Sequence, residues 1–317
     1  MIVTHEDLEG SLASLVRNVR EPSAGIFGPD SLAWRLGGDL AVFLGGGRAA
    51  LLQLAHPLVA HAIDHHSRTR ADVIGRFERT FRHVFAMTFG PLDDAIWAAR
   101  RVHQIHTRVH GEISETVGGV AAGTRYHAND AEALLWVHAT LVDTTILVRQ
   151  RLGARVSRHD LDRYAQEMNR FAALFGIPEA LLPATWRDHE AYMARMIPML
   201  AVAPCAREMA TFLFGRASRV QPPLGRITEA VAAAMLPDRL VEQFGLQRSR
   251  VIVDAAFALG APIYKCLPAR MTAIPAHAAA IRRLAGKPPS AFSAWAERKL
   301  FALTERMAGD QNRTRRG

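Results

Sequence analysis

Cysteine is scarce in this sequence. The 317 residues include only Cys205 and Cys266, which are too few to build a disulfide framework. The N-terminus carries acidic residues early and lacks the basic start, the apolar core and the small-residue cleavage site of a secretory signal. We therefore expect a protein of a reducing compartment, the cytoplasm.

Long uninterrupted apolar runs are also missing. A membrane-spanning helix needs about 20 such residues, and the longest candidate, residues 50–63, is interrupted by His56, Pro57 and His61. The formal net charge of +9 could attract nucleic acid, anionic lipid or an acidic small molecule. The arginines are scattered, however, and no long basic stripe with interleaved aromatic residues is present. We expect no membrane span and no specific nucleic-acid binding, and the sequence leaves the oligomeric state open.

Strand-like alternation is hard to find, whereas apolar residues recur at intervals of three and four in nearly every long segment. This pattern predicts an all-α fold in which many helices form a single domain over residues 1–317. The expected helices cover residues 7–19, 31–44, 48–66, 70–89, 92–113, 130–152, 159–176, 179–200, 204–214, 225–236, 249–261 and 290–307.

The run Gly45-Gly46-Gly47-Arg48 invites comparison with a phosphate-binding loop. A P-loop follows a strand and ends in Lys followed by Ser or Thr, whereas this run follows a predicted helix and has neither residue. It is typical of a tight turn instead.

Histidine is unevenly distributed, because ten of the 14 histidines lie between residues 56 and 138. Three of them, His103, His106 and His110, are three and four residues apart, so on a helix they would project from one face. Two of them could meet a metal ion. The order HxxHxxxH nevertheless lacks the glutamate of an HExxH zinc site, and no clear carboxylate ligand replaces it. These residues alone leave a metal site, a cofactor site and a polar helix face as alternatives.

Two further polar groups stand out. Arg76, Arg79 and Thr80 share one face of their predicted helix, where two guanidinium groups and a hydroxyl would suit an anion or an oxygen that gains negative charge. A solvated face is the alternative. His138 lies among apolar residues, five positions before Asp143, and is either a buried, hydrogen-bonded histidine or a ligand.

The succession of these motifs resembles one family. The segments RAALLQLAHPLVAHAIDHHS, GRFERTF, VHQIHTRVHG, NDAEALLWVHATLVDT and LFGIP are similar to the MpaB-type and rubber oxygenase (latex-clearing protein) family over residues 30–200, with further helices beyond. The resemblance implies an all-α fold with a globin-like core that holds one b-type haem. It also implies an enzyme class, since the rubber oxygenases add O₂ across a carbon–carbon double bond of polyisoprene.

The resemblance implies roles for individual histidines. The proximal haem histidine of the family lies in a segment of the form H-A-x-V-R, and His106 takes the matching position in IHTRVHG. His106 is therefore the implied iron ligand. His103 and His110 would flank the haem, and His138 is a further candidate for contact with the cofactor.

The resemblance also implies roles for arginines. The haem propionates need cationic partners, and the candidates are Arg48, Arg76 and Arg101. The family's distal Arg-x-x-Lys-Thr motif reads RFERT here, so Arg76, Arg79 and Thr80 are the implied catalytic residues. Arg79 replaces a lysine that can coordinate iron in the family, and a guanidinium has no lone pair to offer a metal.

The first hypothesis is therefore a haem b-dependent oxygenase that uses O₂. A small apolar or lipid-like substrate is expected, because polyisoprene cannot enter a cell. The alternative is a haem-binding or gas-sensing protein without turnover. It is favoured by Arg79 and by a second departure, since Asp64 is the only acid where the family has a candidate glutamate base. A third hypothesis is a non-haem metal enzyme that uses the same histidines.

Overall fold

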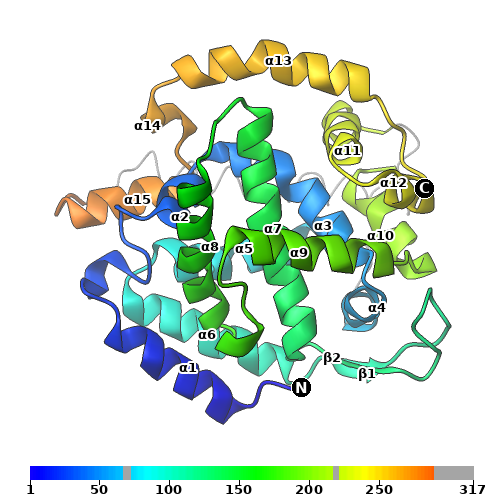
Figure 1. The fold of residues 1–317 in the computed structure, drawn as a ribbon, viewed down its shortest axis with the longest axis horizontal. Coiled ribbons are helices and arrows are strands. Elements are labelled where there is room, and N and C mark those ends of the chain that lie inside the picture. The colour runs from blue at the N-terminus through cyan, green and yellow to red at the C-terminus, as the bar shows by residue number, and fades with distance from the viewer. Residues whose placement is uncertain (67–72, 217–220, 289–317) are drawn as a thin grey trace, which may run out of the picture.

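Apolar residues at helical spacing fold as helices throughout the part of the chain that the structure describes. The computed structural model describes residues 1–66, 73–216 and 221–288 (Figure 1), and the side chains of α5 from Thr80 onward. Within these ranges the α-helices are α1 (His5–Arg17), α2 (Leu32–Gly37), α3 (Gly46–Leu54), α4 (Pro57–His66), α5 (Val73–Phe89), α6 (Leu92–His106), α7 (Ala131–Arg151), α8 (Arg158–Ala173), α9 (Trp186–Met196), α10 (Pro204–Leu213), α11 (Pro223–Ala234), α12 (Asp238–Phe244), α13 (Arg250–Cys266), α14 (Ala269–Thr272) and α15 (Pro275–Leu284). Two short strands, β1 (His110–Glu112) and β2 (Arg125–His127), pair antiparallel. The all-α prediction is confirmed.

The helix α7 lies at the centre of the molecule, with α3, α8 and α13 packed against it (Figure 1). It begins after Asp130, whose carboxylate accepts hydrogen bonds from two backbone N–H groups of the first turn. Its side chains are apolar on several sides, and Trp136 and Ile146 are almost completely buried. A helix of this composition is stable in water only where other elements cover it, so the core forms around α7.

The composition of α7 also corrects the expectation that no segment of the chain is apolar enough to span a membrane. By length and composition, this helix is apolar enough to cross a membrane, and two bent helix pairs, residues 40–66 and 186–213, pass the same test within the described part. In the fold, 61% of the apolar window of α7 is buried. Packing against neighbouring helices therefore covers most of the surface that made the helix so apolar.

Two predicted helices end earlier than expected. The helix predicted over residues 48–66 is broken before Pro57, and the segments on either side are bent by 99°, because proline offers no N–H and disfavours helical geometry in the residue before it. The helix predicted over residues 92–113 ends at His106, since residues 110–112 pair with β2 instead. The helix predicted over residues 290–307 lies outside the described residues.

The glycine run at residues 45–47 is a helical junction rather than a turn. The short 3₁₀ helix η2 (Leu40–Gly45) passes directly into α3. A Cβ atom on Gly45 would overlap the Thr144 side chain of α7 and lie 2.9 Å from Val148 Cγ2. By contrast, a Cβ on Gly46 would have no neighbour within 4 Å. Gly45 is therefore needed for the close approach of the junction between η2 and α3 to α7.

This contrast gives a matched pair of variants. Gly45→Ala should lower the free energy of unfolding by roughly 1–3 kcal/mol, because the added methyl group overpacks a close contact. Gly46→Ala should leave it unchanged or raise it by up to about 1 kcal/mol, because Gly46 has helical backbone angles and alanine restricts the unfolded chain. Urea denaturation followed by circular dichroism measures both. Equal stability of the two variants would contradict the close packing inferred for Gly45.

Candidate functional site

His106 is the last residue of α6. It follows Val102 by four residues and Ala99 by seven, so it leaves the helix on the side that faces the core. Ala99 is fully buried and Val102 partly so, whereas His106 itself is half-buried. The imidazole therefore lies where the core-facing side of α6 reaches the end of the helix.

The predicted distal residues belong to α5, which packs against α6, the helix that ends at His106. The two helices are joined at Gly90 and Pro91 and pack against each other. Position 75 of α5 is as many residues from this connection as His106 is, so the two positions are level along the hairpin. Thr80 is exposed and lies about 7 Å along the helix axis from position 75, toward the connection. The side chains of Arg76 and Arg79 lie outside the described part of the chain.

His103 is tied to the N-terminal segment. It is 7% exposed, its Nε2 atom lies 3.1 Å from the backbone oxygen of Val3, and the Asn129 side chain donates to its backbone oxygen. His110 is exposed in β1, where its ring stacks on that of His127 at 5.9 Å. The three histidines therefore do not share one helix face, because α6 ends before His110. Contacts of His103 and His110 with a cofactor stay predictions.

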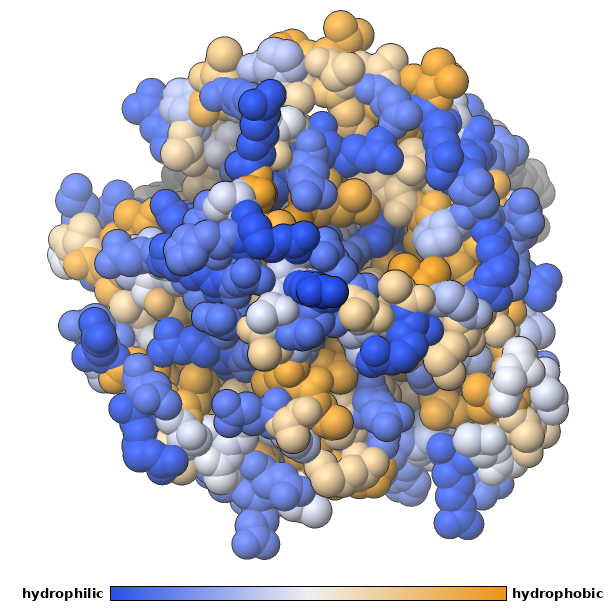
Figure 2. All heavy atoms as spheres, in the orientation of Figure 1, coloured by the Kyte–Doolittle hydropathy of each residue, from blue (hydrophilic) through white to orange (hydrophobic). Residues whose placement is uncertain are grey.

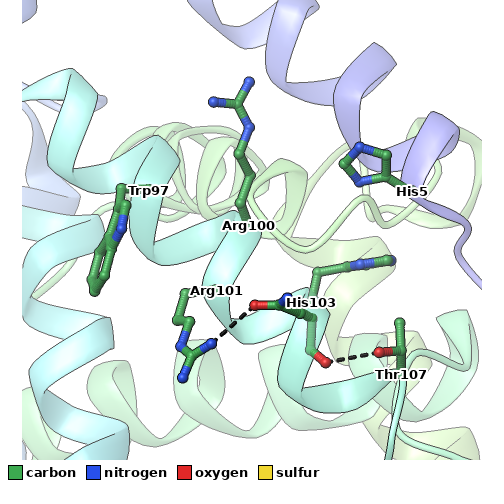
Figure 3. A pocket seen from close by; sticks show the side chains of 7 residues that line it. His5, Trp97, Arg100, Arg101, His103 and Thr107 are labelled. Atoms are coloured by element: carbon green, nitrogen blue, oxygen red, sulfur yellow. Dashed lines mark hydrogen bonds between the residues drawn. The ribbon is translucent and has the colours of Figure 1, made fainter.

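A surface pocket lies along the outer side of α6 (Figure 3). It has a volume of about 460 Å³ and is lined by His5, Trp97, Arg100, Arg101, His103, Gln104 and Thr107. Arg101 donates to the Gln104 side chain at 2.9 Å, and Arg100 pairs with Glu9 at 2.7 Å. Arg101 is five residues before His106, so the two side chains leave the helix about 140° apart. Arg101 therefore points away from the side of α6 that carries His106.

Arg48 is buried in an ion pair. Its Nη2 atom lies 2.6 Å from Asp143 Oδ2, Nη1 donates to Thr144 Oγ1 at 2.5 Å, and Nε donates to the backbone oxygen of Met235 at 2.9 Å. The guanidinium thereby links α3 to α7 and to the end of α11. The predicted contact with a haem propionate would compete with these three hydrogen bonds.

His189 of α9 completes this buried polar cluster. It is 2% exposed, and its Nε2 atom lies 3.7 Å from Asp143 Oδ1, a little beyond hydrogen-bonding distance. Burial raises the pKa of Asp143, but His189 and Arg48 outweigh that effect and hold the pKa below its usual value. His189 could not be found from the sequence, since WRDHEA has no recognisable spacing and tertiary packing brings His189 near Asp143.

His138 is a neutral, buried imidazole. It is 5% exposed and its ring stacks on that of Phe171 at 6.3 Å. Its Nδ1 atom has no hydrogen-bond partner within the described part of the chain. Burial, with a smaller effect from His189, lowers the pKa of His138 to about 3. The hydrogen bond expected for a buried histidine at this position is therefore not found at Nδ1.

The pKa of His138 predicts a pH-dependent stability. Between the ordinary histidine value of 6.5 and about 3, the unfolded chain takes up a proton at this residue that the folded chain does not. The free energy of unfolding should therefore fall as the pH drops through this window. The contribution of His138 to the slope of this decrease should approach that of one proton taken up on unfolding. His138→Phe, which keeps a ring against Phe171, should remove that contribution, whereas substitution of the exposed His159 by Gln should not. Denaturant titrations between pH 7 and pH 4 measure it, and an unchanged slope in His138→Phe would contradict the assignment.

Comparisons with known proteins identify the family of this chain and a solved structure with a similar fold. The family described as "ER-bound oxygenase mpaB/B'/Rubber oxygenase, catalytic domain" matches residues 34–261, more than half of the chain and well beyond residue 200. No curated protein gives a significant match. Among solved structures, the chain is similar to one entitled "Structure of Latex Clearing Protein LCP in the closed state", with 16% identity, a TM-score of 0.51, and coverage of 94% of this chain and 89% of that one. At this identity the likeness concerns the all-α fold, and the family match shows that the chain belongs to the mpaB and rubber oxygenase family.

Proposed function

We propose that this protein is a haem b-dependent oxygenase that acts with O₂ on a small apolar or lipid-like substrate in the cytoplasm. Membership of an oxygenase family supports the reaction class. The observation that carries the cofactor assignment is the position of His106, which occupies the family's histidine motif and lies half-buried on the core-facing side of α6. His106 would be the proximal iron ligand.

The donor set suits a haem better than a non-haem metal. A porphyrin supplies four iron ligands itself, so one protein histidine can be enough, whereas a non-haem iron site typically uses two histidines and a carboxylate. Within the described ranges, no three histidine, cysteine or acidic side chains lie together as such a set. A single half-buried histidine at a helix end fits axial ligation of a haem.

The haem would supply the iron chemistry that activates O₂. The chain itself would supply hydrogen bonds and positive charge. The Thr80 hydroxyl would donate to an oxygen that gains negative charge, and Arg76 and Arg79 would stabilise that charge from the same helix. Arg48 and Asp143 would act at a distance, because their hydrogen bonds hold α3 against α7.

The iron ligand can be tested by absorption spectroscopy. The protein, expressed with a haem precursor, should show a Soret band and near-stoichiometric haem. His106→Ala should lose both, because no other residue is expected to replace the axial ligand. His159→Ala is the matched control and should keep its haem, since His159 is exposed in the first turn of α8. A full haem complement in His106→Ala would overturn the ligand assignment.

The role of Thr80 can be tested by O₂ consumption. With unsaturated fatty acids or short isoprenoids as trial substrates, Thr80→Ala should keep its Soret band and lose turnover by about 10²-fold, the usual effect of removing one preorganised donor. Thr80→Ser, which restores the hydroxyl, should recover most of the rate. Full activity of Thr80→Ala would remove this residue from the mechanism.

A haem-binding or gas-sensing protein is the second candidate. It is favoured by Arg79, which stands where the resemblance implies a lysine able to coordinate iron. Substrate-dependent O₂ consumption by the wild-type protein separates the two candidates. A stable oxygenated spectrum without consumption of any alkene or lipid would support the second.

A further inference from the structure

The helix α13 is apolar on two opposite sides. One side, formed by Val253, Phe257 and Ala261, is buried against the protein. The opposite side, which includes Leu259 and Ile263, is exposed. A helix that is apolar all round is normally covered on all sides, so the outer side of α13 needs an explanation.

The exposed residues form a continuous stripe. Val251, Ile252, Leu259 and Ile263 are 84%, 70%, 74% and 68% exposed, and at helical spacing they follow one another along the outer side together with the small residues between them. Large apolar side chains in such a group mark a binding surface far more often than isolated ones do.

The shape of this surface is convex. In Figure 1, α13 runs along one edge of the molecule, outside α7 and α11, on which it packs. Figure 2 shows apolar atoms along the same edge. A single projecting helix suits a fluid partner that can adapt to it, such as the interfacial region of a lipid bilayer.

Both ends of the stripe are basic. Arg248 and Arg250 precede it, and Lys265 and Arg270 follow it. Asp238 pairs with the first two arginines at 2.6 and 3.0 Å. Near the middle of the helix, Asp254 pairs with Arg151 of α7. Among these residues of the described chain there are five cations and two acids, and the surplus of positive charge is complementary to anionic headgroups.

We infer that the outer side of α13 binds the surface of an anionic phospholipid bilayer. Its apolar stripe would enter the interfacial region, and the basic residues at both ends would contact headgroup phosphates. A second copy of this chain is a poorer occupant, because a side-by-side pairing of α13 with itself, parallel or antiparallel, places basic ends against basic ends. The inference is independent of the proposed haem chemistry, since it concerns residues far along the chain from His106 and requires no turnover.

Co-sedimentation with vesicles tests this inference on the full-length protein. Wild type should bind vesicles of equal parts phosphatidylcholine and phosphatidylglycerol, more weakly as salt rises, and should bind pure phosphatidylcholine poorly. Leu259→Ser combined with Ile263→Ser should lower the partition coefficient at least about tenfold, because two apolar side chains no longer enter the bilayer. Val251→Ser combined with Ile252→Ser provides a second variant at the other end of the stripe.

The matched control removes equally apolar residues elsewhere. Met199 and Leu181 are 70% and 41% exposed, and Met199→Ser combined with Leu181→Ser should leave vesicle binding unchanged. Circular dichroism checks that every variant is folded. Unaltered sedimentation of both α13 variants would overturn the inference. So would light scattering that shows a wild-type dimer which the α13 variants lose, because the occupant would then be a second copy.

Discussion

The buried ion pair between Arg48 and Asp143 is the interaction on which the centre of the structure depends. A charge buried without a partner costs several kcal/mol, so these two side chains can be inside only if α3 and α7 are held in one register. The backbone oxygen of Met235 accepts a hydrogen bond from Arg48, and the His189 ring lies 3.7 Å from Asp143, so two further segments meet at the same pair. Gly45 makes the arrangement possible, because a side chain at that position would push α3 away from α7.

Several of the histidines that cluster in the sequence make separate local contacts instead of forming one site. His61 bonds through Nδ1 to the backbone oxygen of Pro57, and His65 contacts the Tyr126 hydroxyl at 2.8 Å. His103 fastens the N-terminal segment to α6, and His138 packs against Phe171. The high local frequency of histidine thus reflects several separate contacts. His106 differs from them because it lies at the end of α6, at the level where the N-terminal part of α5 begins.

Two helices of similar composition have opposite surroundings. Both α7 and α13 are apolar on more than one side, yet α7 is enclosed by its neighbours and α13 keeps its outer stripe in contact with solvent. The hydrophobic effect favours covering both surfaces. Neighbouring helices cover the apolar surface of α7. The outer stripe of α13 is not covered in this way and is the surface that we infer binds an anionic bilayer.

The sequence by itself determined the helical class, the positions of most helices and the motif that contains His106, because helix formation and motif spacing depend on residues close together in the chain. Only the tertiary structure decided where α6 ends, since residues 110–112 pair with β2. It also decided that Arg48 pairs with a carboxylate 95 residues away and that His189 joins them. Spacing along a helix fixes which side chains share a face, whereas the partner of that face is set by packing between distant segments.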